Sequence, residues 1–359
     1  MENKLLDKKY RLFGIDHFTD EENEKFWERR SNGEITLHII GISATSACNY
    51  RCNYCYGIIA KSEGKKLSLD EYKSIIDQAY DLNARSVLVC GDGEPTVDKD
   101  LVEIVKHAHS KGMYSVIVSN GNIFGNDELS RKVYNMSSDE LVDVFYNNGA
   151  SFIFKLESLN EELYDTIVDV KGSFRQYMNG LEKIFKRGFC NTKDFGDGTK
   201  LTRVAFSGVI SKQNFHEVPA LQKFAHDHDA QFICKFPSFI GNTELNKDLF
   251  FIPTEDTTLW LRENYIRKYS EKPETLTTDT IHCGAWSYGA VIGETGDIRL
   301  CYTAACPPAR SVGNVREGSL RSLLEKRENV FDKLLTKGEP CHIKRKQYIY
   351  QGGSANAEL

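Results

Sequence analysis

The chain has 359 residues, of which 40% are hydrophobic and 27% are charged, and its formal net charge is −5. This length fits one large domain or two with an ample core, and the scattering of basic residues among acidic ones argues against a nucleic-acid-binding surface. No apolar stretch approaches the span of a membrane helix, and the polar N-terminus lacks the apolar core of a signal peptide, so we expect a cytoplasmic protein.

Short apolar segments alternate with segments of helical periodicity after a charged opening segment. The apolar segments predict strands buried on both faces: Thr36–Ile42, Ser86–Cys90, Tyr114–Ser119, Ser151–Leu156, Thr202–Ile210 and Ala230–Phe236. The periodic segments predict helices: Leu69–Leu82, which starts with a capping box of Ser68 and Glu71, then Leu101–Ser110, Asp139–Asn147, Phe174–Lys186 and Phe215–Asp227. This alternation predicts βαβ units in an α/β fold, with a barrel-like or open parallel sheet.

The sequence changes in character after about residue 240. Asn242–Pro253 predicts a linker and Glu255–Tyr269 a helix. Further on, Ala290–Ile292 and Ile298–Cys301 predict a hairpin, and Leu320–Leu335 another helix. We therefore expect an N-terminal segment (1–35), the barrel (36–240), a linker and helix (241–280), a small Cys-rich α+β module (281–345) and a tail (346–359).

Cys48, Cys52 and Cys55 form the pattern C-x3-C-x2-C soon after the first predicted strand. Ten cysteines without a secretory signal favour metal binding or catalysis over a disulfide framework. Cysteine thiolates hold iron–sulfur clusters, and a cubane normally takes four, so three ligands leave one iron open to another molecule. The alternatives are unrelated thiols or a zinc site, whose local histidine, His38, would lie in the preceding strand.

Polar residues follow four successive predicted strands. Because the carboxyl ends of parallel strands meet at one edge of a sheet, these residues predict a ligand site there. Glycines in the second group permit close backbone approach, although that group alone is equally well explained as a simple turn. The groups are the cysteine loop, Gly91-Asp92-Gly93-Glu94-Pro95, Ser119-Asn120-Gly121-Asn122 and Glu157-Ser158.

These motifs together resemble those of the radical S-adenosylmethionine (SAM) enzymes. Tyr54 stands before the last loop cysteine, as an aromatic residue does in that family's signature. Gly91–Pro95 resembles the family's Gly-Gly-Glu-Pro loop, whose backbone holds the methionine amino group. The likeness covers about residues 36–240, which form a partial (β/α)6 barrel in that family. It implies cofactor contacts at Tyr54, Gly91, Asp92, Gly93, Glu94, Ser119, Asn120, Glu157, Ser158 and, near the adenine, Ile210.

The sequence departs from the family pattern at two places. Asp92 stands where the family often has glycine, a position that Asp can occupy because it tolerates positive φ better than most residues. Val170-Lys171-Gly172 replaces an Arg-Gly pair, so we assign no arginine to the cofactor carboxylate. The sequence also identifies no catalytic residue for proton transfer.

The resemblance also implies the chemistry. SAM would chelate the open iron of a [4Fe-4S] cluster held by Cys48, Cys52 and Cys55, and an electron donor such as flavodoxin or ferredoxin would supply the reducing electron. Cleavage of SAM would yield methionine and a 5′-deoxyadenosyl radical, which takes a hydrogen atom from the substrate. The protein would supply positioning and the exclusion of water.

A second group of cysteines lies in the last quarter of the chain. Cys283 and Cys301, with Gly296 between them, form C-x12-G-x4-C, which resembles the opening of the SPASM and twitch extensions of this superfamily. Cys283, Cys301, Cys306 and Cys341 suffice for one auxiliary [4Fe-4S] cluster, so the single-cluster twitch-like form is the better match. Two alternatives stay open: a zinc ribbon-like site, or a cluster in which His342 or substrate replaces Cys306.

We therefore predict a radical SAM oxidoreductase, or a transferase or cyclase, with two [4Fe-4S] clusters. A small-molecule substrate and a net oxidation are favoured, because peptide modifiers often carry a leader-binding domain and here the first predicted strand starts at Thr36. One alternative is a maturase of a ribosomally made peptide. Another is a non-enzymatic metal- or cluster-bearing binding module, which would leave Gly91–Pro95 without a purpose. Neither nucleic acid nor membrane is an expected partner.

Overall fold

The computed structural model describes residues 9–57, 64–235, 237, 240–250, 289–299 and 311–337. The predicted helix Glu255–Tyr269 and the cysteines at 283, 301, 306 and 341 lie outside the described residues. In the described part of the chain, no helix is both long and apolar enough to cross a membrane.

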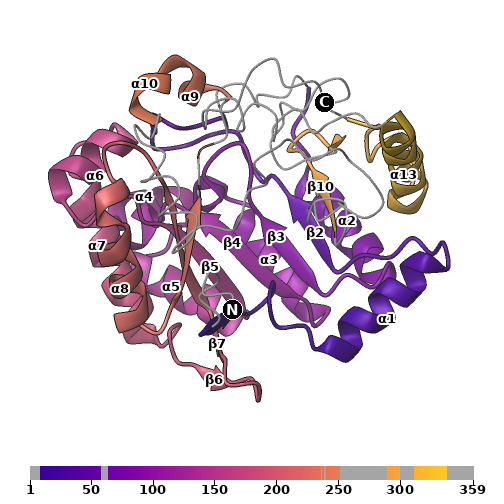
Figure 1. The fold of residues 1–359 in the computed structure, drawn as a ribbon, viewed down its shortest axis with the longest axis horizontal. Helices are drawn as coiled ribbons and strands as arrows, with labels where there is room; N and C mark the ends of the chain where they lie inside the picture. The colour runs from indigo at the N-terminus through magenta and orange to yellow at the C-terminus, as the bar shows by residue number, and fades with distance from the viewer. Residues whose placement is uncertain are drawn as a thin grey trace.

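An eight-stranded sheet forms the centre of the molecule, with helices packed around it (Figure 1). Neighbouring strands from β10 to β9 pair in parallel, and β11 pairs with β10 in the antiparallel direction. This α/β sheet confirms the predicted partial barrel. In sheet order the strands are β11 (Ile298–Arg299), β10 (Gly289–Ile292), β2 (Ile39–Ile42), β3 (Ser86–Val89), β4 (Tyr114–Ser119), β5 (Ala150–Lys155), β8 (Val204–Val209) and β9 (Gln231–Lys235).

The helices of the barrel follow the strands along the chain. The predicted capping box of Ser68 and Glu71 opens the first of them, and a second box, of Ser137 and Glu140, opens α5. The segment predicted as a helix from Phe215 opens with a 3-10 turn, Phe215–Glu217, and the α-helix starts at Val218, with Pro219 in its first turn, where its missing N–H costs nothing. The helices of the barrel are α2 (Leu69–Asp81), α3 (Leu101–Ser110), α4 (Asp127–Tyr134), α5 (Ser138–Asn147), α6 (Glu161–Val168), α7 (Ser173–Arg187) and α8 (Val218–Asp227).

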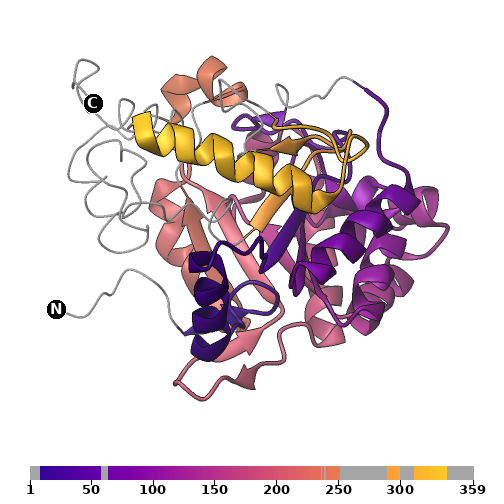
Figure 2. The same cartoon turned by 90° about the vertical axis from the view of Figure 1, so that its right-hand side faces the viewer.

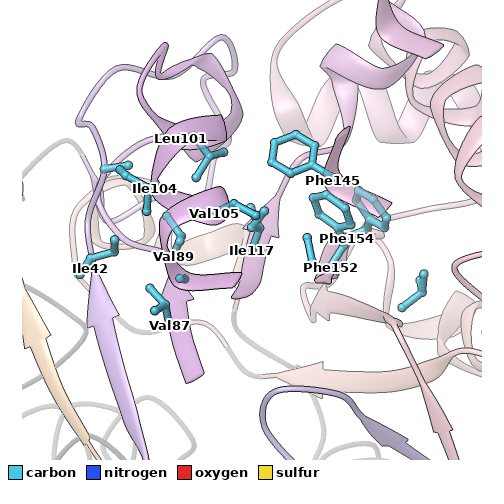
Figure 3. Close-up of a cluster of buried hydrophobic side chains, with 14 of the residues drawn as sticks. Ile42, Val87, Val89, Leu101, Ile104, Val105, Ile117, Phe145, Phe152 and Phe154 are labelled. Carbon is cyan, nitrogen blue, oxygen red and sulfur yellow. The ribbon is translucent and has the colours of Figure 1, made fainter. Parts of the chain in front are cut away.

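One apolar core joins the strands to these helices, and Figure 3 shows part of it. Aliphatic side chains of β2, β3 and β4 meet the buried face of α3, and aromatic side chains fill the space beside β5. Phe152 and Phe154 stack with ring centroids 5.0 Å apart, and Phe145 meets Phe152 edge-on at 5.5 Å. Burial on both faces explains why these strands are continuous apolar runs rather than alternating ones.

Several elements at the N-terminal side differ from the sequence-based expectation. The charged opening segment contains α1 (Asp20–Ser31), which buries Phe26 and opens with a capping box of Thr19 and Glu22. A small separate sheet joins β1 (Tyr10–Leu12), β7 (Lys200–Thr202) and β6 (Lys193–Asp194). The strand predicted over 202–210 is therefore divided, since β7 belongs to this small sheet and β8 to the main one.

The described C-terminal segments pack onto the barrel. The predicted hairpin is confirmed, and its first strand, β10, pairs with β2 and so lengthens the barrel sheet. The predicted last helix is α13 (Leu320–Lys337), which lies along the hairpin side of the molecule (Figure 2). Its Leu320, Leu323 and Leu324 join the common core, and its buried Arg327 donates to the Gly289 carbonyl at 2.7 Å.

Candidate functional site

The cysteine loop lies between β2 and α2, on the side of the sheet where the parallel strands end. The Arg51 and Asn53 amides donate to the carbonyls of Val168 and Ile167, at the end of α6, both at 3.0 Å. From another side, Asn242, in the short helix α9 (Asn242–Leu245), donates through its side chain to the Cys52 carbonyl at 2.9 Å. A second short helix, α10 (Lys247–Phe250), follows α9, so the predicted linker is partly helical. The loop is thus fixed from two sides by residues distant in the sequence.

The three loop thiols lie in surroundings suited to a cationic group. Cys48 is exposed, whereas burial raises the pKa of Cys52 well above its usual value and the nearby Glu157 adds to that shift. Backbone amides nevertheless point at two sulfurs, from Tyr50 to Cys48 at 3.4 Å and from Gly57 to Cys55 at 3.2 Å. A bound metal centre supplies the positive charge that deprotonates such thiols.

The described residues contain no three His, Cys, Asp or Glu side chains arranged as ligands of a single metal ion. A cubane binds each thiolate through a different iron, so its ligands need not converge on one point. Three cysteines in one loop are a donor set of the kind that iron–sulfur clusters use. His38, the histidine considered as a zinc ligand, instead stacks its ring on that of Phe26, with the ring centroids 4.0 Å apart.

Glycines let the Gly91–Pro95 loop approach the cysteine loop backbone to backbone. A Cβ on Gly93 would lie 2.2 Å from the Ala47 carbonyl oxygen, and one on Gly57 would lie 2.2 Å from that of Asp92. The Glu94 amide donates to the Ala47 carbonyl at 2.9 Å. Gly91 has a positive φ of +136°, whereas the φ of Asp92 is not positive. The expectation that Asp92 has to tolerate positive φ is therefore wrong.

Glu94 ties the end of β3 to the end of β4. Its buried carboxylate accepts from the Ser119 hydroxyl at 2.7 Å, the Asn120 amide at 2.6 Å and the Thr96 hydroxyl at 2.7 Å. Burial raises the pKa of Glu94, although these hydrogen bonds oppose the shift. The structure thus brings three predicted site residues together, and it shows that their side chains bind one another.

A chain of side-chain amides joins the cysteine loop to the same strand end. Asn120 donates to Asn49 at 2.8 Å, Asn49 donates to Asn122 at 3.0 Å, and Asn122 donates to Gln176 at 2.6 Å. Asn49 was not predicted as a site residue, although its place directly after Cys48 is a usable signal. These contacts fix the cysteine loop relative to β4 and α7.

Tyr54 and Glu157 connect the cysteine loop to the end of β5. The Tyr54 hydroxyl donates to one Glu157 oxygen, and the Val209 amide donates to the other at 2.9 Å. Burial raises the pKa of Glu157 and raises that of Tyr54 well above its usual range. Ser158, also predicted here, instead donates to Glu217 at 2.8 Å. Ile210 is fully buried just beyond β8.

An unpredicted ion pair lies behind the Gly91–Pro95 loop. Arg299, at the end of β11, donates to Asp92 at 2.8 Å, and their side chains are 3% and 0% exposed. Ser43, just beyond β2, also donates to the Asp92 carboxylate at 3.2 Å. Asp92, predicted as a cofactor contact, is therefore engaged by the protein itself.

Residues 42–203, which contain the cysteine loop, Gly91–Pro95 and the ends of β4 and β5, match the family model of the radical SAM superfamily. Over these residues the chain is similar to members of this superfamily. It is 27% identical to Fe-coproporphyrin III synthase of Methanosarcina barkeri over 70% of this chain and 57% of that protein. It is 25% identical to PqqA peptide cyclase of Rhizobium meliloti, over 78% and 71%, and 28% identical to GTP 3',8-cyclase of a Picosynechococcus species, over 62% and 63%. The matches span about half the length of the first curated relatives, 57% and 47%.

The fold is also similar to that of solved structures. Streptococcus suis SuiB bound to S-adenosylmethionine superposes with a TM-score of 0.59 at 15% identity, over 94% of this chain and 79% of that one. The same protein bound to its precursor peptide SuiA gives 0.57 at 15% identity, over 84% and 68%. At this identity the likeness supports the fold.

Proposed function

We propose that this radical SAM protein holds a [4Fe-4S] cluster on Cys48, Cys52 and Cys55 and cleaves SAM to abstract hydrogen from a small molecule, in a net oxidation. The observation that carries the proposal is the backbone contact between the cysteine loop and Gly91–Pro95. That contact brings the two motifs of the family signature to one edge of the sheet.

The chain's own residues would position the cofactor. When bound and reduced, the cluster supplies one electron to SAM, which yields methionine and a 5′-deoxyadenosyl radical able to take a hydrogen atom. Backbone groups of Gly91–Pro95 would hold the methionine part, because Glu94 fixes that loop against β4. The Tyr54–Glu157 hydrogen bond would hold the aromatic residue of the signature in place beside the cysteines. Preorganised groups of this kind contribute to catalysis because they need not reorganise during the reaction.

We further propose one auxiliary [4Fe-4S] cluster on Cys283, Cys301, Cys306 and Cys341, in a twitch-like arrangement. The glycine of C-x12-G-x4-C supports it: Gly296 takes a φ of +90° in the hairpin turn, where L-residues are strained. When bound, such a cluster would supply a one-electron acceptor for the electron that remains on the substrate after loss of a hydrogen atom and a proton. Flavodoxin or ferredoxin would deliver the first electron.

Modification of a ribosomally made peptide is the second candidate function. PqqA peptide cyclases are among the relatives by sequence, alongside Fe-coproporphyrin III synthase and GTP 3',8-cyclases, so both substrate classes are represented.

The test is the production of 5′-deoxyadenosine by anaerobically reconstituted, reduced protein, followed by mass spectrometry. The wild type should cleave SAM, and the triple Cys→Ala variant of the loop should not. Cys190→Ala is the matched control, because its partly buried thiol follows α7 and lies outside the loop. Intact cleavage by the triple variant would refute the assignment of the cluster ligands. Deuterium-labelled small molecules and peptides then distinguish the substrate classes, since the true substrate transfers its label to deoxyadenosine.

A further inference from the structure

Arg299 reaches from the C-terminal hairpin into the loop that follows β3. Its guanidinium donates to Asp92 at 2.8 Å and, through Nε, to Asp297 at 2.6 Å. The side chains of Arg299 and Asp92 are 3% and 0% exposed. Water therefore reaches neither charge of this pair, although the two residues lie 207 positions apart in the sequence.

A buried ion pair adds little net stability, because both charges lose their hydration. It is nevertheless sensitive to the loss of one partner, since the other charge then remains buried and uncompensated. Such a pair therefore strongly fixes the relative positions of the two segments that it joins. Here those segments are the hairpin β10–β11 and the Gly91–Pro95 loop.

Asp92 is well placed to control this loop. It lies between Gly91 and Gly93, whose backbones lack the steric restraint of a side chain. Its carboxylate accepts from the Ser43 hydroxyl at 3.2 Å, and its backbone amide donates to the Ser43 hydroxyl oxygen at 3.4 Å. A shift of Asp92 would move the glycines that contact the cysteine loop.

The hairpin that carries Arg299 is itself fixed to the barrel. Glu294 lies in the turn of the hairpin. Its carboxylate accepts from the amide of Ser46, two residues before Cys48, at 2.7 Å, and its backbone carbonyl accepts from the Leu67 amide at 2.7 Å. Arg316 donates to the Thr295 carbonyl of the turn at 3.1 Å and pairs with Glu71 of α2 at 2.5 Å. The hairpin thus contacts the approach to the cysteine loop and, through Arg299, the loop after β3.

We propose that Arg299 is a positioning residue for the cofactor site. It fixes Gly91–Pro95 from the C-terminal hairpin, so that SAM affinity depends on the placement of the segment that runs on to Cys301. The proposal rests on the proposed function, because it takes this loop as part of the SAM site. It also assigns a role to the aspartate that replaces a glycine of the family motif.

The experiment compares Arg299→Gln, Arg299→Lys, Asp92→Asn and the double variant Asp92→Asn/Arg299→Gln with the wild type. Arg316→Gln is the matched control, because it removes another arginine contact of the same hairpin, to the Thr295 carbonyl, without touching Asp92. Two quantities are measured: hydrogen exchange of the peptide covering residues 90–97 in protein without cofactor, and the SAM dissociation constant of reconstituted protein by equilibrium dialysis. Iron content is recorded for each variant.

Arg299→Gln should speed exchange of the loop and raise the SAM dissociation constant by about tenfold or more, since it leaves Asp92 charged and unpaired. Arg299→Lys should lie between it and the wild type, because an ammonium lacks the planar fork that spans Asp92 and Asp297. The double variant should recover most of the affinity, since two neutral amides replace the charges. Arg316→Gln should leave both quantities within about twofold of the wild type.

Unchanged exchange and affinity in folded Arg299→Gln would overturn the proposal. So would equal effects in Arg316→Gln, because these would show general loosening of the hairpin. If Arg299→Gln does not fold, the double variant decides: restored folding without restored loop protection contradicts the proposal. Failure of the wild type to bind SAM would refute the proposed function instead, and exchange in the cofactor-free protein would still test the link between Arg299 and Asp92.

Discussion

Gly93→Ala should force the two signature loops apart. The new Cβ would lie 2.2 Å from the Ala47 carbonyl oxygen and 2.7 Å from the Ser46 carbonyl carbon. Both are backbone atoms, which cannot rotate away as a side chain can. An ordinary contact needs more than 3 Å, so the loops would have to separate by about 1 Å.

This displacement lowers the free energy of unfolding in two ways. Overpacking of this kind costs about 1–3 kcal/mol, and the hydrogen bond from Glu94 to Ala47, 2.9 Å long, would weaken or break at a further cost of about 1 kcal/mol. The free energy of unfolding should therefore fall by about 2–4 kcal/mol. SAM affinity should fall as well, because the separated loops form its proposed site.

Urea unfolding and equilibrium dialysis with SAM measure the two effects. Gly318→Ala is the matched control, because its Cβ would meet only the rotatable hydroxyl of Ser322, at 3.0 Å, ahead of α13. If Gly93→Ala keeps wild-type stability and SAM affinity, the close packing of these loops is not what shapes the site.

Three further outcomes are expected. Reconstituted wild type should hold about eight irons, and the triple Cys→Ala variant of the cysteine loop about half of them, as measured by iron assay; an unchanged iron content would exclude these ligands. Cys283→Ala with Cys301→Ala should lose the second cluster while retaining some SAM cleavage without product, as measured by deoxyadenosine and product together; full iron content would remove these cysteines from the ligand set. Burial lowers the pKa of His38 from 6.5 to about 4, so the unfolded chain binds more protons between these values. Stability should therefore fall as pH drops from about 6.5 to about 4, by up to about 3 kcal/mol, and His38→Phe should reduce that fall in pH-dependent unfolding experiments.

Elements with strong local signals were predicted well. Leu101–Ser110 is helical over the predicted range, and Tyr114–Ser119 is a strand over its predicted range, because apolar periodicity marks both. Short helices were not predicted, because a short segment shows little periodicity. α6 spans only Glu161–Val168, so periodicity has little length in which to show, although Asn160 caps its first turn. Phe26 is the one buried residue of α1, so the sequence of this helix indicates a charged segment.

Pairings between distant segments left no local signal. β1 and β7 pair at Tyr10 and Lys200, and nothing in either short segment identifies the other. β10 was predicted as a strand, but its addition to the β2 edge was not, because a hairpin pattern does not indicate which neighbour the hairpin finds. These pairings join segments that are far apart in the sequence and that come together only when the core forms, so neither segment identifies its partner.

The candidate site shows the same division at the level of side chains. That Glu94, Ser119 and Glu157 would meet at one edge followed from the rule that parallel strands end together. The rule does not predict the hydrogen-bond partners of such side chains, since Ser119 binds Glu94 and Ser158 binds Glu217 inside the protein.

The sequence shows the departure at Asp92 but not the partner of its charge. A charge placed in a loop with no room for water must find an opposite charge, and Arg299 supplies it from the other end of the chain. A polar residue that replaces glycine in a binding motif is therefore best treated as one half of a contact whose other half remains to be located.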